Sequence, residues 1–249
     1  TTLSLADRLP NDIIYRPQTA HFASFDKGSS TQQYPSSLMG SIALIRQTLS
    51  DANWYKEAQG LSTSTGALEF NAALSALSNI ASTGVVFDAS DELNALRAAR
   101  VFAEFSLPIT VVGSGFEYAR INELKAANMK LILPLNYPAA PELNEQFAEL
   151  DVSLADLRHW ERAPGNAAVV ANADIPFALT LHGLSKTSDF WPNVRKAIDH
   201  GLSPQRALAA LTTVPAEMAG IADQAGRLAA GYRADFVVSR GDLFNQGEI

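Results

Sequence analysis

The sequence predicts an α/β fold, a partial (β/α) barrel of the TIM type in which parallel strands alternate with helices. Three observations predict it. Short apolar runs alternate with amphipathic stretches from residue 84 onward, the apolar runs end in polar residues, and residues typical of helix caps precede the amphipathic stretches. In a barrel of this kind the functional residues follow the carboxyl ends of the strands.

The stretch from Ile175 to Gly220 shows this order most clearly. Its apolar run Pro176–Leu181 is typical of a buried strand, which ends at His182-Gly183 and leads into a polar loop. A helix is expected next, with Phe190, Val194, Ala197 and Ile198 on one face, closed by Gly201. Ser203 is then expected to cap a second helix with Pro204 in its first position, and Pro215 to open a third that ends at Gly220.

The first third of the chain is less regular. Residues 13–15 and 21–25 are possible short strands, and the polar loop 27–34 precedes a long helix. Ser36 or Ser37 is expected to cap that helix, whose apolar stripe is Leu38, Ile42, Ile45 and Leu49. Residues 60–66 are expected to form a link rich in Ser, Thr and Gly, followed by a helix over residues 67–79.

Strands and helices then alternate. Strands are expected over residues 84–88, 108–113 and 129–135, with helices over 91–105 and 116–128 between them. The long connection 136–174 contains probable helices at 154–160 and 166–173, and residues 234–238 alternate as a hairpin strand would. This rhythm predicts parallel strands.

Composition excludes several classes of function. The formal net charge is −7 and the basic residues are scattered, which argues against binding to nucleic acid or to an anionic membrane. There is no cysteine, so disulfides and thiolate chemistry are excluded. No apolar run approaches the roughly 18 residues of a membrane helix.

Residues 203–238, SPQRALAALTTVPAEMAGIADQAGRLAAGYRADFVV, resemble the carboxyl-terminal signature of the amidohydrolase superfamily, close to its imidazolonepropionase and Xaa-Pro dipeptidase types. Residues 27–55 resemble a segment of large bacterial amidohydrolase-like proteins, many of them exported. The resemblance implies an amidohydrolase-type barrel segment over residues 1–225 that lacks its first strands, and an incomplete return into a small β domain over 226–249. It implies a bacterial protein that is a fragment of a larger one, and it slightly favours the periplasm over the cytoplasm while leaving the compartment open.

The resemblance also implies a chemistry. Active members hydrolyse C–N bonds of amides, cyclic amides or dipeptides with zinc or another divalent metal at the carboxyl ends of the strands. Their ligands are an HxH pair on the first strand, Lys or Glu on the fourth, His on the fifth and sixth, and Asp on the eighth. A bound metal lowers the pKa of a water molecule, so that hydroxide forms near neutral pH.

The alignable ligand positions carry other residue types in this chain. Asp88 stands where the fifth-strand His belongs, Ser114 where the sixth-strand His belongs, and His182 where the eighth-strand Asp belongs. None of the four histidines forms an HxH pair. We therefore expect a degenerate site and no metal in this chain, with Asp88 the only plausible residual ligand besides His182.

Each candidate residue has a structural alternative. Ser90 or Asp91 is expected to cap the helix after Asp88. The turn Gly113–Gly115 either cradles an anion on its backbone N–H groups or needs glycine for steric reasons. His182 is either a hydrogen-bonded loop residue or a catalytic base, and the candidate substrate-binding residues are Ser114, Glu117 and Tyr118.

Three functions follow from these alternatives. The chain is part of an amidohydrolase whose site has decayed, or part of an active one whose ligands lie elsewhere in the polypeptide. The third is a non-catalytic barrel module that packs on, or regulates, an active domain. The expected partners are the rest of its own polypeptide, a sibling amidohydrolase domain or a second copy of the chain. Whether the chain is itself an enzyme stays open at this point.

Overall fold

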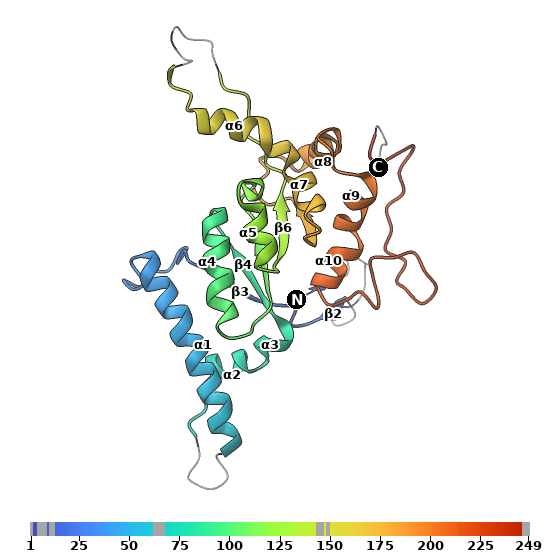
Figure 1. Cartoon of the computed structure of the whole chain (residues 1–249). Coiled ribbons are helices and arrows are strands. Elements are labelled where there is room, and N and C mark those ends of the chain that lie inside the picture. The colour runs from blue at the N-terminus through green and yellow to red at the C-terminus, as the bar shows by residue number, and fades with distance from the viewer. Residues whose placement is uncertain are drawn as a thin grey trace.

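The computed structural model describes residues 2–3, 9, 13–61, 68–142, 147 and 150–245 of the chain (Figure 1). Its centre is a five-stranded parallel sheet with the strands in chain order, and a separate antiparallel pair lies near the amino terminus. The strands of the main sheet are β3 (His21–Ser24), β4 (Val85–Asp88), β5 (Ile109–Val112), β6 (Lys130–Pro134) and β7 (Phe177–Thr180). The small pair consists of β1 (Thr2–Leu3) and β2 (Ile14–Arg16).

Helices follow each strand of the main sheet. Those between β3 and β6 are α1 (Leu38–Leu61), α2 (Ala72–Ala76), α3 (Ile80–Thr83), α4 (Glu92–Ala103) and α5 (Ile121–Ala126), with the 3-10 turns η1 (Leu77–Asn79) and η2 (Glu117–Arg120). Those after β6 are α6 (Leu154–Arg162), α7 (Asn166–Asn172), α8 (Phe190–Asp199), α9 (Pro204–Leu211) and α10 (Thr213–Met218), with the turns η4 (Ala163–Gly165) and η5 (Thr187–Asp189).

The α/β fold and the parallel order are confirmed, and the sheet is an open part of a barrel. In-register parallel pairing runs through all five strands, from His21 opposite Val85 to Pro134 opposite Thr180. Strands β3 and β7 are the outermost strands of the sheet. The possible strand at residues 21–25 is therefore the first of the sheet, whereas the one at 13–15 pairs outside it.

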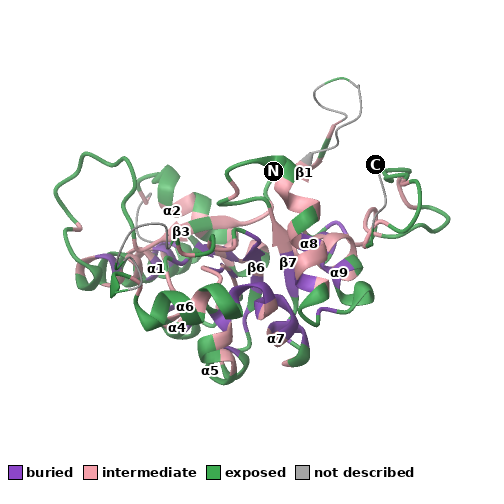
Figure 2. Cartoon of the chain, turned by 90° about the horizontal axis from the view of Figure 1, so that it is seen from above, coloured by how far each residue is buried: buried purple, intermediate pink, exposed green. Residues whose placement is uncertain are grey.

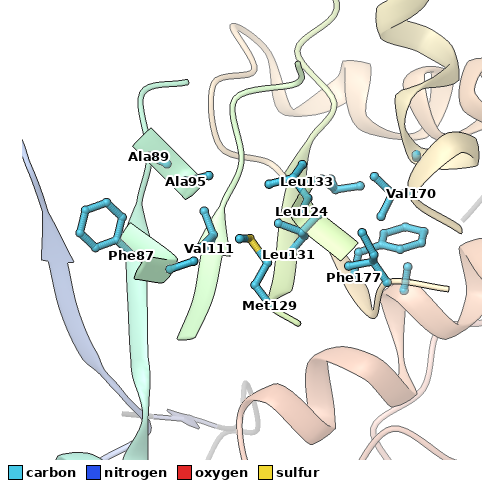
Figure 3. Close-up of a cluster of buried hydrophobic side chains, with 14 of the residues drawn as sticks. Phe87, Ala89, Ala95, Val111, Leu124, Met129, Leu131, Leu133, Val170 and Phe177 are labelled. Atoms are coloured by element: carbon cyan, nitrogen blue, oxygen red, sulfur yellow. The ribbon is translucent and has the colours of Figure 1, made fainter. Parts of the chain in front are cut away.

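The core lies between the sheet and the helices (Figure 3). Alternate residues of the strands point into this layer and are almost fully buried, because strand side chains alternate between the two faces. They are Val85, Phe87, Val111, Leu131, Leu133 and Phe177, packed against residues such as Phe102, Leu124 and Val170. In the view of Figure 2, α4, α5 and α7 lie along one side of the row of strands.

The opposite face of the sheet is open at its β3 end. Phe22 points to this face and is 80% exposed, although its neighbours His21 and Ala23 are partly buried. Val86, in register with Phe22, is also less buried than Val85 and Phe87 beside it. The chain thus covers the helix side of its sheet, and it leaves the inner face more accessible at β3 than at β7, where Ala178 is buried.

Several capping predictions are confirmed. The side chains of Asp91 and Ser203 accept hydrogen bonds from the backbone N–H of Asn94 and Arg206, so Asp91 rather than Ser90 caps α4. The hydroxyl of Ser37 accepts from Gly40 N at the start of α1. Gly201, with φ of 104°, follows α8 in the left-handed conformation that glycine tolerates.

Other boundaries differ from the prediction. Gly60 and Leu61 of the expected link belong to α1 instead, and residues 62–67 lie outside the described residues. Helix α2 begins at Ala72, because the side chain of Asn71 caps it by accepting a hydrogen bond from Leu74 N. The helix expected over 116–128 is a 3-10 turn followed by the short α5. The strand expected over 234–238 is wrong, because these residues are irregular. Phe236, Val237 and Val238 are exposed, and no strand in the described part of the chain pairs with them.

No helix in the described part of the chain is long and apolar enough to span a lipid bilayer.

Candidate functional site

The carboxyl ends of the parallel strands meet at one edge of the sheet, where polar residues follow four of them. Asp88 ends β4, Ser114 follows β5, Asn136 follows β6, and His182 follows β7. This edge is where barrels and open α/β sheets place their chemistry, so it is the candidate site. The sequence predicted three of these four positions.

Asp88 is exposed at the end of β4. Its backbone carbonyl accepts a hydrogen bond from the Ser24 hydroxyl at 3.2 Å, which ties the ends of β3 and β4 together. Asp91 caps helix α4 instead, because its Oδ1 accepts a hydrogen bond from Asn94 N at 2.6 Å. The Asp88 carboxylate is therefore not needed as a helix cap, and a role as residual ligand remains a prediction.

The turn after β5 holds an anion that belongs to the chain itself. Oε1 of Glu117 accepts hydrogen bonds from Ser114 N at 2.7 Å and Gly115 N at 3.2 Å. Glu117 is only 1% exposed. A Cβ on Gly113 would overlap Glu117 Oε1 and lie 2.8 Å from its Cδ, so glycine is required for the carboxylate to seat here. Both alternatives for this turn apply here: Gly113 meets a steric need, and two backbone N–H groups bind an anion, which is the carboxylate of Glu117.

Asn166, at the start of α7, satisfies the other oxygen of Glu117. Its Nδ2 donates to Glu117 Oε2 at 2.6 Å, and its Oδ1 accepts from Tyr118 N at 2.8 Å. Asn166 is itself buried, so the charged carboxylate is matched by three donors in a site with little solvent. The pair joins the turn after β5 to the helix that precedes β7.

The hydroxyl of Ser114 is the unmatched group in this turn. It is buried and makes no hydrogen bond, the only such side-chain atom in the described part of the chain. Ser114-x-x-Glu117 has the spacing of a capping box, in which the Glu reaches back to the backbone and the Ser caps the turn. The Glu117 carboxylate accepts the hydrogen bond from Ser114 N that this motif requires, but the Ser114 hydroxyl accepts none. This spacing was the sequence signal for the role of Glu117.

Three rings stack beside the turn. The rings of Phe116 and His159 are nearly parallel, with an interplanar angle of 8° and centroids 3.6 Å apart. The Tyr118 hydroxyl lies 3.0 Å from His159 Nδ1. Burial lowers the pKa of His159, against the opposing effect of Glu117 and Asp156, and burial raises the pKa of Tyr118. Both groups are therefore held in their neutral forms near pH 7.

These contacts describe what the predicted substrate-binding residues do in the folded chain. Ser114 offers a buried hydroxyl, Glu117 binds backbone and amide N–H groups, and Tyr118 contacts His159 on α6. A role of the three in substrate binding remains a prediction.

His182 follows β7 in a tight turn. Its backbone N–H donates to Thr180 Oγ1 at 3.1 Å, and the residue is exposed. The next residue, Gly183, has φ of 78°, and a Cβ there would lie 2.7 Å from Asn136 Nδ2. The glycine lets the turn after β7 approach Asn136 after β6. Whether the His182 imidazole acts as a base stays open.

Hydrogen bonds join the segment after β6 to the first turn of α8. Asn193 Nδ2 donates to Leu135 O at 2.7 Å, and the Tyr137 hydroxyl donates to Asn193 O at 3.3 Å. Burial raises the pKa of Tyr137 well above its ordinary value. This phenol is therefore a fixed neutral hydrogen-bond donor that holds the segment after β6 against α8.

The donor set does not fit a catalytic divalent metal. Among the residues that the structure describes, no three His, Cys, Asp or Glu side chains come together as a metal site would need. Asp88 and His182 follow strands that two other strands separate. Between them, Ser114 offers a hydroxyl, which is a poor zinc ligand, and the nearby carboxylate of Glu117 is already bound to three N–H groups.

A comparison with known protein families shows to which family the chain belongs. The model of the amidohydrolase family matches residues 83–247, which is more than half of the sequence. The chain belongs to the amidohydrolase family. No curated protein sequence matches it at a significant level.

Solved structures agree with this family in fold. An amidohydrolase from Thermotoga maritima MSB8 superposes with a TM-score of 0.77 at 17% identity, over 98% of this chain and 62% of that one. A prolidase complexed with N-methylphosphonate-L-proline superposes with a TM-score of 0.51 at 15% identity, over 92% of this chain and 65% of that one. At these identities the likeness concerns the fold, and the chain spans less than two thirds of either protein.

Proposed function

We propose that this chain is a barrel portion of an amidohydrolase-family protein whose metal site is degenerate. In this proposal it does not itself hydrolyse C–N bonds. Instead it packs on the rest of its polypeptide or on a sibling amidohydrolase domain. The observation that carries the proposal is the chemistry of the strand ends, where the family resemblance implies His, His and Asp.

The contacts around those positions support it. The carboxylate nearest to the β5 turn is committed to Ser114 N, Gly115 N and Asn166 Nδ2, so it is not free to bind a cation. The Ser114 hydroxyl is buried, and moving it toward a metal would disturb the same turn. Asp88 and His182 alone provide fewer ligands than the three or four that a zinc site uses.

The direct test is metal analysis of the purified chain. Zinc is added in excess, removed by dialysis and measured by mass spectrometry in the wild type, Asp88→Ala and His182→Ala. The proposal expects far less than one zinc per chain in all three. Stoichiometric zinc in the wild type that disappears in either variant would overturn it.

A second function has one specific observation in its favour. Asp88 and His182 are both exposed at the same edge of the sheet, and the chain spans only 62% of the Thermotoga amidohydrolase. Ligands from elsewhere in a longer polypeptide would complete an active hydrolase. In that case the longer polypeptide cleaves dipeptides or cyclic amides with zinc or manganese, and Asp88→Ala and His182→Ala abolish turnover. Unchanged turnover in both variants rules out a catalytic contribution from this chain.

A further inference from the structure

A cleft of about 620 Å³ lies at the opposite edge of the sheet, beside the amino-terminal ends of β4, β5 and β6. Residues of β2 and α10 complete its wall. Its volume falls in the range of small-molecule sites, which runs from roughly 300 to 1,000 Å³. It is separate from the candidate site, because parallel strands place their two ends at opposite edges.

Lys130, the first residue of β6, places a positive charge in the wall of this cleft from the inner face of the sheet. It lies in register with Thr110, which lies in register with Val86 and Phe22, so these four residues form one row across the inner face. Neighbouring Leu131 points to the core on the other side and is fully buried. Within the described residues, Lys130 makes no side-chain hydrogen bond and no ion pair. A lysine on the inner face of a barrel sheet requires an anion once that face is covered.

Arg16 brings a second positive charge, held in a fixed orientation. Its Nε donates to Gln18 O at 3.0 Å and its Nη1 donates to Gly220 O at 3.2 Å. A Cβ on Gly220 would overlap Nη1, so the guanidinium lies directly against this glycine. Both acceptors are neutral carbonyls, and within the described part of the chain Arg16 pairs with no carboxylate.

The charge balance of the cleft is positive. Glu217 on α10 is the one acidic residue among the described residues that line it, against the two cations Arg16 and Lys130, and it lies beyond ion-pair distance of both. The planar guanidinium matches a carboxylate in geometry, and an ammonium adds a compact charge. The Thr110 hydroxyl, in the same row as Lys130, adds a neutral donor.

We propose that this cleft, which Arg16 and Lys130 both line, binds a carboxylate group through these two cations. The group comes either from a free small carboxylate or from an Asp or Glu side chain of a longer form of the polypeptide that covers the inner face. Both sources satisfy the same two cations, and the experiment separates them.

The probe is succinate, titrated into the 249-residue chain and followed by calorimetry. Saturable binding with a Kd of about 1 mM is expected. Lys130→Met and Arg16→Met weaken binding by about tenfold or more. Lys130→Arg retains binding, which separates loss of charge from loss of folding. Lys125→Met, on the exposed surface of α5 outside the cleft, serves as the matched control and binds as the wild type does.

Three results decide the proposal. Failure of succinate to saturate the chain, or equal binding by Lys130→Met and Lys125→Met, overturns it. In a longer polypeptide, retained succinate binding assigns the site to a free carboxylate. Lost binding together with protection of Lys130 from acetylation, measured by mass spectrometry, assigns it to a side chain. Lost binding with Lys130 still reactive also overturns the proposal.

Discussion

Glu117 and Asn166, 49 residues apart in the sequence, meet at 2.6 Å through a carboxylate oxygen and an amide nitrogen, and both are buried. The same carboxylate binds two backbone N–H groups of the turn after β5. One side chain therefore fixes the strand-end turn and joins it to α7. Glu117 therefore has a structural role at a turn where anion binding by the backbone was one of two alternatives.

Replacement of Glu117 by Ala is expected to destabilise the chain by about 3 kcal/mol, because three donors lose their acceptor in a buried site. Urea unfolding followed by circular dichroism measures the loss. Glu123→Ala is the control: Glu123 is half exposed and pairs only with Arg120 one turn away, so its loss costs about 0.5 kcal/mol or less. Equal costs for the two variants would contradict the structural role of Glu117.

Formate provides a second measurement on the same variant. Formate is small enough to occupy the space left by the missing carboxylate in Glu117→Ala. There it restores an acceptor for the N–H groups of Ser114 and Gly115. A ligand that binds only the folded state stabilises it. We therefore expect formate to raise the unfolding midpoint of Glu117→Ala more than that of the wild type. A chloride salt at the same ionic strength serves as the control.

Two glycines near the carboxyl terminus have the same backbone conformation and different surroundings. Gly226 has φ of 88° and Gly231 has φ of 87°. A Cβ on Gly226 would lie 2.8 Å from Ala216 Cβ and 2.9 Å from Thr212 O, whereas a Cβ on Gly231 meets nothing within 4 Å. Alanine at Gly231 is expected to cost about 1 kcal/mol from the left-handed conformation alone.

Alanine at Gly226 is expected to cost about 1–3 kcal/mol more, because it also collides with backbone and a packed methyl group. Thermal unfolding compares the two variants directly. Limited proteolysis of the segment after Gly226 detects release of that segment from the junction between α9 and α10. If both variants lose the same stability, the close packing at Gly226 is wrong.

The pKa of His159 is expected to make stability depend on pH. Burial lowers it below the ordinary value of 6.5, so the unfolded chain binds a proton at a higher pH than the folded chain does. The contribution of His159 is complete above pH 6.5. It is lost as the pH falls from there through the lower folded-state pKa.

Urea midpoints measured between about pH 8 and pH 5 test this expectation. His159→Phe keeps a ring against Phe116 and removes the titrating group, so its midpoint should fall less with acid than that of the wild type. Lys125→Met, which changes an exposed residue of α5 and no imidazole, is the control and should keep the wild-type slope. An identical slope in His159→Phe and the wild type would exclude His159 as the cause.

The sequence predicted those parts of the fold that depend on local patterns. Alternation of apolar runs located β4 to β7, and the cap residues Asp91 and Ser203 marked two helix starts. The prediction was wrong where a strand needs a distant partner. Residues 234–238 have the alternation of a strand, but alternation forms no strand without a neighbour to accept its hydrogen bonds.

For the candidate site, the sequence predicted the positions at the strand ends but not the contact between distant residues. The family resemblance singled out positions 88, 114 and 182, and the local pattern placed them at strand ends. The partner of Glu117 did not follow, because Asn166 lies 49 residues later and only the packing of α7 beside the β5 turn brings the two together. The capping-box spacing from Ser114 to Glu117 is a signal that could have predicted half of this arrangement.

The strand order of the main sheet equals the order of the strands in the chain, and each strand pairs only with those made just before and just after it. A nascent chain can therefore add each strand to the growing edge as it leaves the ribosome, without waiting for residues yet to be synthesised. This strand order permits vectorial assembly of the sheet, with β7 the last of its five described strands to be added.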